Sequence, residues 1–208
     1  MTNPALSDGS AAADAALMAR LACGDASALD PLYRRHRGAV YRFALLWCGS
    51  AAKAADATQD VFLHLLTHAG DYDVSRGALG AWLLGIARNF ARRRSGVTEL
   101  PLGEDDDAVP PALVDEATPH AALASQRDVE RLRRAIAALP PHYRDVVVLV
   151  ELAERSYAET AGICGCELNT VRSRLFRGRS LLARWLALDA GETTAPRAGA
   201  VASTRSLR

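Results

Sequence analysis

Residues 156–179, SYAETAGICGCELNTVRSRLFRGR, carry the strongest structural signal in this chain. They predict a short helix, a tight turn at Gly165, and a longer basic helix from Asn169 to about Leu188. This order of elements is typical of a helix-turn-helix. Pro140-Pro141 separates two further helices that are expected before it. The C-terminal part of the chain is therefore expected to be entirely helical.

The basic helix has an apolar face and a polar face on a helical wheel. Val171, Leu175 and Leu182 fall on the apolar face and are expected to pack on the preceding helices. The polar side chains in the first half of this helix that could reach DNA are Asn169, Thr170, Arg172, Ser173, Arg174 and Arg177. Amide and guanidinium groups read base edges in a major groove, and hydroxyl groups hold phosphates, so this helix is expected to contact DNA. The simpler alternative is a solvated basic face.

The N-terminal part, from Asp14 to about Arg94, also shows helical periodicity, because apolar residues recur at spacings of three and four. Breaks are expected at Gly24-Asp25, at Gly49-Ser50 and over residues 70–77. Few residues in this part are β-branched and strict alternation is absent, so no strand is predicted. The whole chain is expected to be all-α, with two helical domains at residues 14–95 and 121–188.

Charge is divided unevenly between the two domains and the segment that joins them. The 208 residues carry a formal net charge of +1, but residues 1–95 carry +3, residues 96–120 carry −7 and residues 121–188 carry +4. The middle segment also holds four prolines and the acidic run 104–107, which predicts a flexible acidic linker. Residues 1–13 and 189–208 are expected to be disordered.

Several functional classes are excluded by what the sequence lacks. No apolar run is long enough to span a membrane and no secretory signal is visible, so a cytoplasmic protein is expected. No phosphate-binding loop or nucleophile motif is present, so neither an enzyme nor a cofactor is expected. The residues considered for a metal or redox role are Cys164 and Cys166, as a C-x-C pair, and His64 and His68, at i and i+4. Only His142 lies near the cysteine pair in sequence, and no third ligand is placed to complete a site at the histidines, so no metal site is predicted.

Five strings, in order along the chain, resemble those of a known family. DATQDVF at 56–62 is similar to sigma region 2.2, and YDVSRGALGAWLLGIARN at 72–89 to regions 2.3 and 2.4. The runs at 138–149, 156–161 and 169–179 resemble region 4. The combination resembles an extracytoplasmic-function, or group IV, factor of the sigma-70 family. Glu159-Thr160-Ala161 departs from the usual Glu-Ile-Ala, and Arg92-Arg93-Arg94 departs from the usual end of region 2.4.

The resemblance implies a binding partner for each of three sets of residues. The implied contacts with the β′ clamp helices of core RNA polymerase are Asp56, Gln59, Asp60, Phe62 and Leu63. The implied contacts with the minus-ten promoter element are Tyr72, Ser75, Arg76, Arg88, Asn89, Arg92 and Arg93. The six polar residues of the basic helix would read the minus-thirty-five element. The linker would follow a path near the active centre and the RNA exit channel, and an anti-sigma factor is an expected further partner.

Simpler structural interpretations stand beside these roles. Leu63 is the one apolar residue on a polar helix face, which fits a binding surface and a scattered exposed leucine equally well. Trp82, at helical spacing from Leu83 and Ile86, is expected to be core. Two other functions also compete with the sigma factor. One is a helix-turn-helix repressor or activator with a sensing N-terminal domain, and the other is a metal or redox sensor.

Overall fold

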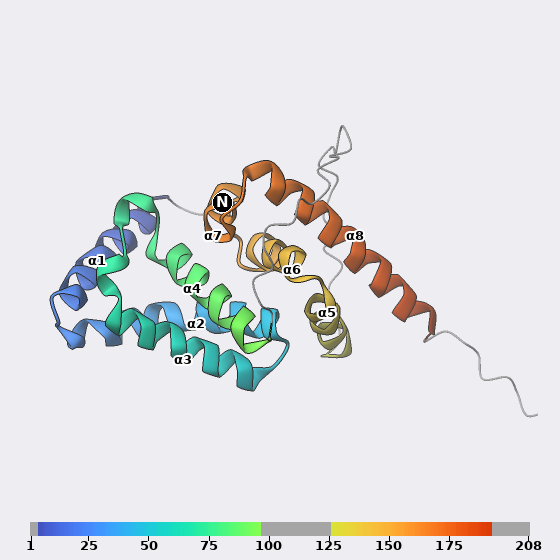
Figure 1. Ribbon diagram of the computed structural model, residues 1–208, viewed down its shortest axis with the longest axis horizontal. Helices are drawn as coiled ribbons and strands as arrows, with labels where there is room; N and C mark the ends of the chain where they lie inside the picture. Colours follow the sequence, from blue (N-terminus) through green and yellow to red (C-terminus); the bar gives the residue numbers. More distant parts are fainter. Residues whose placement is uncertain (1–3, 97–125, 193–208) are drawn as a thin grey trace, which may run out of the picture.

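The computed structural model describes residues 4–96 and 126–192, and Figure 1 gives the order of their helices. The N-terminal module consists of α1 (Pro4–Ala22), α2 (Leu29–Cys48), α3 (Ala51–Thr67) and α4 (Leu79–Arg94), with short 3-10 turns between them. The C-terminal module consists of α5 (Gln126–Ala138), α6 (Pro141–Val147), the π-helical turn η4 (Val148–Leu152), α7 (Tyr157–Cys164) and α8 (Leu168–Glu192). The described residues form no strand, which confirms the all-α prediction.

The N-terminal module packs α2, α3 and α4 around a core of large apolar side chains. Phe43, Trp47, Leu65 and Leu83 are each at most 1% exposed. Gly49 ends α2 with a left-handed φ of 64°, a conformation that glycine adopts without strain, and Ser50 then caps α3. The breaks expected at Gly24-Asp25 and Gly49-Ser50 lie where the structure has them.

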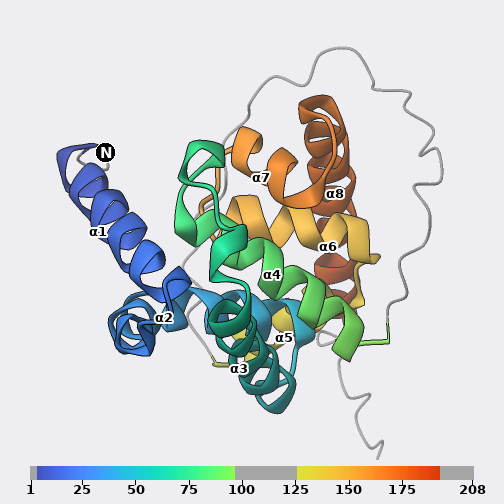
Figure 2. The same cartoon turned by 60° about the vertical axis from the view of Figure 1, so that its left-hand side comes forward.

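The two modules share one continuous core in this structure. Ile136, Val148 and Leu149 of the C-terminal module belong to the same buried cluster as Trp47 and Leu83. The contacts run from α2 to α5 and η4, and from α4 to α7, and the modules lie side by side in both Figure 1 and Figure 2. The prediction of two helical domains is confirmed, and the structure adds that their apolar faces cover each other.

Three predicted boundaries differ from the structure or fall outside it. Pro4 to Ala13 belong to α1, although disorder was predicted for residues 1–13. Alanine is the strongest helix former, and this segment is rich in it. Asp189 to Glu192 likewise extend α8, where disorder was predicted. The predicted linker lies outside the described residues, except for Gly96, which follows the last turn of α4.

Candidate nucleic-acid and protein interfaces

A groove of ≈ 680 Å³ lies between α2 and α3. Its lining is mainly apolar and consists of Leu29, Tyr33, Arg37, Gly38, Tyr41, Ala55, Thr58, Gln59, Phe62, Leu63 and Leu66. The Tyr33 and Phe62 rings meet edge to face with their centroids 4.8 Å apart. Leu63 is 52% exposed on its rim. An exposed apolar groove with polar residues at its edge is a surface on which an apolar helix face can dock.

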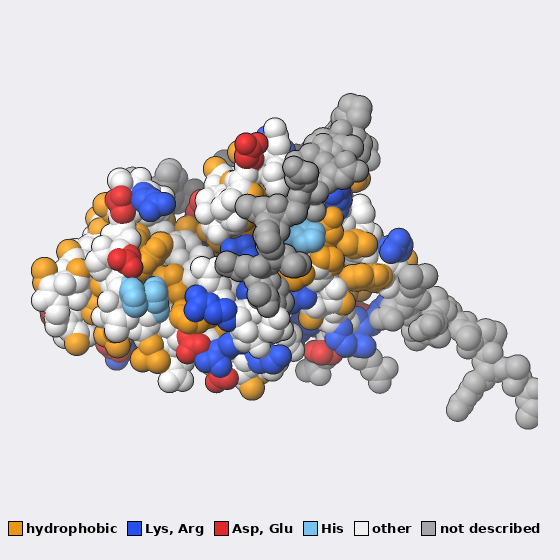
Figure 3. Space-filling model, viewed as in Figure 1, with side chains coloured by type: hydrophobic (Ala, Val, Ile, Leu, Met, Phe, Trp, Pro, Cys, Tyr) orange, Lys and Arg blue, Asp and Glu red, His pale blue; other side chains and the backbone are white. Residues whose placement is uncertain are grey.

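The structure divides the residues predicted to bind polymerase into two groups. Gln59, Phe62 and Leu63 line the groove, with Phe62 buried at 4% exposure. Asp56 and Asp60 instead face α4, where Arg94 binds both carboxylates, at 3.2 Å and 2.6 Å respectively. Basic and acidic side chains accordingly lie intermixed over α3 and α4 in Figure 3. The two aspartates stabilise the packing of α3 on α4, and they also remain partly exposed.

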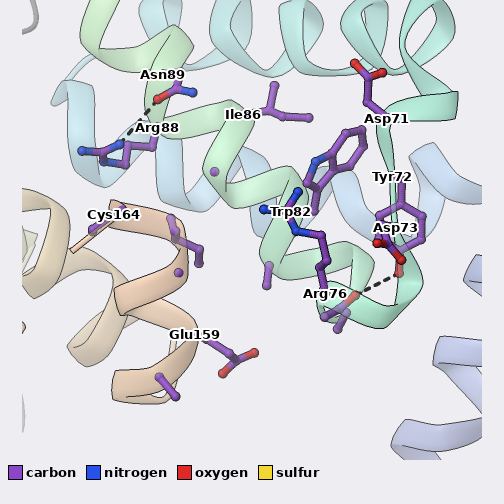
Figure 4. Close-up of a pocket in the computed structure, with 18 residues that line it drawn as sticks. Asp71, Tyr72, Asp73, Arg76, Trp82, Ile86, Arg88, Asn89, Glu159 and Cys164 are labelled. Atoms are coloured by element: carbon purple, nitrogen blue, oxygen red, sulfur yellow. Dashed lines mark hydrogen bonds between the residues drawn. The ribbon is translucent and has the colours of Figure 1, made fainter. Parts of the chain in front are cut away.

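The segment before α4 forms one wall of a second pocket, of ≈ 510 Å³ (Figure 4). Asp73 accepts hydrogen bonds from the Ser75 backbone at 2.9 Å and from its hydroxyl at 2.7 Å, and these bonds hold the Asp73 pKa below its ordinary value. Tyr72 donates to the Gly77 carbonyl at 3.1 Å, and burial raises the Tyr72 pKa. The loop is thus fixed by its own side chains.

Residues of α4 form the base of this pocket, and α7 closes its other side. Figure 4 shows Trp82, Ile86 and Asn89 on α4, with Glu159 and Cys164 of α7 across the pocket. Trp82 packs against the shared core, as expected, and also lines the pocket. The pocket therefore brings together four of the seven predicted minus-ten residues, which are Tyr72, Arg76, Arg88 and Asn89.

Two of the predicted minus-ten arginines face the C-terminal module. Arg88 Nε lies 2.6 Å from Asp145 Oδ2, and Arg92 Nη1 lies 3.9 Å from the same oxygen. Burial by itself lowers the Arg88 pKa. The charge and the hydrogen bond of the Asp145 carboxylate act in the opposite direction, and the Arg88 pKa is raised overall. Asp145 is only 1% exposed and also accepts a hydrogen bond of 2.7 Å from Trp47 Nε1. We call this set the Asp145 clasp, since it joins α2 and α4 to α6.

Ser75 and Arg93, which line neither the pocket nor the clasp, are on the surface, and so is the pocket residue Arg76. Ser75 and Arg76 are exposed on the loop, and Arg93 is exposed near the end of α4. The Arg93 guanidinium lies 5.2 Å from the centroid of the Phe90 ring, a cation–π distance. These side chains form a basic, hydrogen-bonding surface beside the pocket.

The helix-turn-helix is built as the sequence predicts. Ser156 and Glu159 form a capping box that begins α7, and Gly165 ends α7 with a left-handed φ of 64°. Val171 and Leu175 are at most 2% exposed. Gly178 allows α8 to approach α6, because a Cβ at this position would lie 2.7 Å from Val147 Cγ2. The apolar face of α8 therefore packs as expected.

The predicted minus-thirty-five residues lie on the exposed and half-buried sides of α8. Asn169 and Arg172 are exposed, and Arg172 Nη1 donates to Asn169 Oδ1 at 3.5 Å. The hydroxyl of Ser173 donates to the Thr170 carbonyl at 3.1 Å, as is common for serine within a helix. The half-buried members of the set are Thr170, Ser173, Arg174 and Arg177.

The structure adds residues that the sequence prediction missed. Tyr33 and Leu66, 38% and 39% exposed, enlarge the apolar surface of the α2–α3 groove. Asp145 lies within the run at 138–149 and had no assigned role, although a carboxylate directly before Val146-Val147-Val148 is a signal that it is buried with a partner. Within the described ranges, no group of three or more His, Cys, Asp or Glu side chains could hold a metal ion. None of the described helices is long and apolar enough to cross a bilayer.

Comparison with known proteins agrees with this division of the chain. The family model for Sigma-70 region 2 matches residues 32–95, and the model for Sigma-70, region 4 matches residues 129–182. The chain is 35% identical over 179 residues to the ECF RNA polymerase sigma factor SigE of Mycolicibacterium smegmatis, covering 83% of this chain and 68% of SigE. It is 33% identical over 174 residues to SigM of Mycobacterium tuberculosis, covering 83% and 84%.

Two solved structures are also similar to this one. CnrH in complex with the cytosolic domain of CnrY has a TM-score of 0.64 at 24% identity, covering 85% of this chain and 99% of CnrH. RpoE in complex with the anti-sigma factor NepR, from Bartonella quintana, has a TM-score of 0.56 at 25% identity, covering 77% of this chain and 97% of RpoE. At 24% identity, the similarity to CnrH shows only that the two chains share a fold.

Fold and surfaces together define a two-module transcription factor with a helix-turn-helix at its C-terminal end. More narrowly, the chain belongs to the extracytoplasmic-function sigma factors of the sigma-70 family. It is a transcription initiation factor that binds core RNA polymerase and directs it to promoters. A helix-turn-helix repressor or activator is not favoured, because residues 32–95 match sigma region 2.

Proposed function

We propose that each step of promoter recognition falls to one of the surfaces described above. The α2–α3 groove docks to the clamp helices of polymerase, the pocket before α4 binds the minus-ten element, and the polar side of α8 reads the minus-thirty-five element. The observation that carries the proposal is the presence of two separate hydrogen-bonding, basic surfaces in one chain beside an apolar groove. Single-stranded bases and phosphates suit the first surface, and a duplex major groove suits the second.

The direct test is run-off transcription with purified core polymerase, because it separates the sigma factor from a plain DNA binder. Addition of the purified full chain is expected to give promoter-specific transcripts from a template carrying its minus-ten and minus-thirty-five elements. The chain alone is expected to make none, since we propose no enzymatic activity of its own. Duplex binding without specific initiation would contradict the proposal.

The groove is tested by removing its exposed apolar contact. Leu63→Ala, combined with Gln59→Ala, is expected to weaken core binding by about 1–2 kcal/mol, a typical loss for truncating a central contact. Leu152→Ala is the matched control, because Leu152 is an exposed leucine outside the groove. Titration of labelled protein with core polymerase measures both variants. Equal affinities for all three proteins would remove the groove from the proposal.

The acidic side of α3 needs a separate control, because Arg94 already binds Asp60. Asp60→Arg removes the 2.6 Å ion pair as well as a proposed polymerase contact. Arg94→Ala breaks the same pair but keeps both carboxylates. Weaker core binding in Asp60→Arg alone would assign the carboxylate to polymerase, and equal losses in both variants would assign it to the packing of α4.

The polar side of α8 is tested by shortening its arginines. Arg174→Ala or Arg177→Ala is expected to cost about 1–3 kcal/mol of duplex affinity at one base or phosphate upstream. Core binding should not change, because neither residue lines the α2–α3 groove. Competition assays with duplexes altered at single positions measure the first effect, and core titration the second. Loss of core binding in either variant would count against the assignment.

A regulatory partner completes the proposal. The similar structures are described as complexes with CnrY and with the anti-sigma factor NepR. By this analogy we propose that an anti-sigma factor holds the present chain inactive, and that the chain works in the cytoplasm, where polymerase and promoters are. Co-expression with a neighbouring gene product that blocks run-off transcription would support this, and a lack of inhibition would contradict it for that product.

A further inference from the structure

The junction of α1, α2 and α4 contains a buried carboxylate to which no role has yet been given. Asp14, on α1, is only 4% exposed. Its Oδ1 accepts a hydrogen bond from Arg35 Nη1, and its Oδ2 lies 2.9 Å from His36 Nε2. Both partners belong to α2. A buried carboxylate costs free energy unless it is paired, and Asp14 has a partner for each of its oxygens.

The His36 ring connects this carboxylate to the start of α4. The His36 side chain is 13% exposed, and its Nε2 faces Asp14. Its Nδ1 lies on the other side of the ring, 3.9 Å from the place that a Cβ would take at Gly80, in the first turn of α4. A single imidazole ring therefore separates Asp14 from the point at which the pre-α4 loop, residues 69–78, enters α4.

The helix that carries Asp14 also packs against the other end of this loop. Contacts join α1 to η2 (Ala69–Asp71), which begins the pre-α4 loop, and to α4. Met18 of α1 and Ala69 of η2 are buried in the same apolar cluster, and Tyr72 packs against it. Burial is the main cause of the raised Tyr72 pKa, and the negative charge of Asp14 adds to it. Asp14 is thus close enough to act on the loop.

We infer that Asp14 is a positioning residue for the minus-ten surface, because its bonds to Arg35 and His36 fix α1 against the pre-α4 loop. The hydrogen bonds inside the loop set its shape, but they do not set its place on the module. Apolar contacts are not directional, whereas two hydrogen bonds to one carboxylate specify a single placement of α1. Asp14 itself touches no DNA, and the inference rests on the proposed binding of the minus-ten element beside this loop.

The first test measures the affinity of the full chain, assembled with core polymerase, for single-stranded DNA. The probe is an oligonucleotide that the wild-type assembly selects from a randomised pool. Asp14→Ala is expected to weaken this affinity about tenfold, a typical size for a substitution that acts on a site through intervening residues. Affinity for core polymerase should not change, because Asp14 does not line the α2–α3 groove.

The second test observes the loop in the absence of DNA. The centroids of the Tyr72 and Trp82 rings are 5.5 Å apart, so a displaced loop changes the surroundings of Trp82. When the chain is labelled with fluorotryptophan, fluorine NMR gives a separate resonance for Trp47, Trp82 and Trp185. Asp14→Ala is expected to shift the Trp82 resonance and to leave the other two in place. A general loss of stability would move all three.

Two further variants serve as controls in both tests. Asp14→Asn keeps the shape of the side chain, and its oxygen can accept from Arg35 while its amide donates to the His36 ring, so it should retain most of the affinity for the strand. Asp30→Ala removes an exposed carboxylate that lies 3.0 Å from Arg34 on α2 and contacts neither α1 nor the loop through this pair. It should change neither the affinity nor the Trp82 resonance.

Four results would overturn the inference. An unchanged affinity for the strand in Asp14→Ala would show that the loop is placed without this carboxylate, and an equal loss in Asp30→Ala would show that any paired carboxylate of this region has the same effect. An equal loss of core affinity, or three resonances that move together, would show that Asp14 only stabilises the fold. Failure of the proposed function gives a different result, because the wild-type assembly would then select no strand while the Trp82 resonance still reports on the loop.

Discussion

At the scale of single residues, the environment of a side chain matters more than its identity. Cys166 and Cys48 are both thiols, yet a neighbouring thiol and two arginines lower one pKa, whereas burial raises the other. Asp145 and Asp56 likewise share a carboxylate, but the first is 1% exposed and joins the modules, whereas the second lies on the surface beside Arg94.

The Cys166 environment predicts the pH dependence of its alkylation. In the Cys23→Ser, Cys48→Ser chain, the rate of reaction with iodoacetamide should rise with a midpoint near pH 7, because only the thiolate reacts. Cys164→Ala removes the neighbouring thiol that does most to lower the Cys166 pKa, so the midpoint should move upward toward the ordinary value of 9.0. Peptide mass spectrometry at a series of pH values measures both. A midpoint close to 9.0 before the Cys164 change would refute the proposed environment.

At the scale of the elements, the contact between α6 and α8 depends on the absence of one side chain. Gly178→Ala would place a Cβ 2.7 Å from Val147 Cγ2 and close to the Tyr143 carbonyl, so α8 must move away. We expect the free energy of unfolding to fall by about 1–3 kcal/mol, as in other overpacked cores. Chemical denaturation followed by circular dichroism measures the change.

Gly162→Ala, in the same module, is expected to raise stability instead of lowering it. Gly162 lies inside α7, and a Cβ there would meet nothing within 4 Å. Alanine is favoured over glycine in helices, so this variant should gain about 0.5–1 kcal/mol of stability. A similar effect of both substitutions would show that helix propensity, rather than the close approach at Gly178, governs this module.

These elements also show what sequence periodicity could and could not predict. The helix starting at Leu79 and the turn at Gly165 were predictable, because glycine breaks and apolar spacing are local signals. The polar side of α8 followed from the same wheel. The partners of Arg88, Asp56 and Asp60 were not predictable, since ion pairs between distant elements have no local pattern. The start of α1 differs from the prediction because its alanine-rich segment lacks apolar spacing, the signal by which periodicity identifies a helix.

At the scale of the whole molecule, the Asp145 clasp sets the arrangement of the two modules. It turns Arg88 and Arg92, two proposed minus-ten contacts, toward α6 and away from solvent. Asp145 takes up charge and hydrogen-bond donors of these two side chains that a promoter strand would otherwise use. Binding of Arg88 to DNA therefore competes with the clasp, and the free energy of the clasp opposes separation of the modules.

Removing the carboxylate is expected to favour separation. Asp145→Ala leaves Arg88 and Trp47 Nε1 without their shared acceptor, and an unpaired buried charge costs about 3–5 kcal/mol. Separation returns Arg88 to water at a lower cost, so the modules should move apart while each keeps its helices. Small-angle X-ray scattering should show a larger radius of gyration, and circular dichroism should show unchanged helical content.

Two further variants distinguish opening from a general loss of stability. Asp145→Asn keeps an acceptor for Trp47 but loses the charge that pairs with Arg88, so its radius of gyration should lie between those of the wild type and Asp145→Ala. Glu151→Ala removes a carboxylate that binds Arg179 at 2.9 Å within the C-terminal module, and it should leave the radius unchanged. Expansion in Glu151→Ala would indicate a general loss of stability, and none in Asp145→Ala would mean that apolar contacts of Trp47 and Ile136 hold the modules together without the clasp.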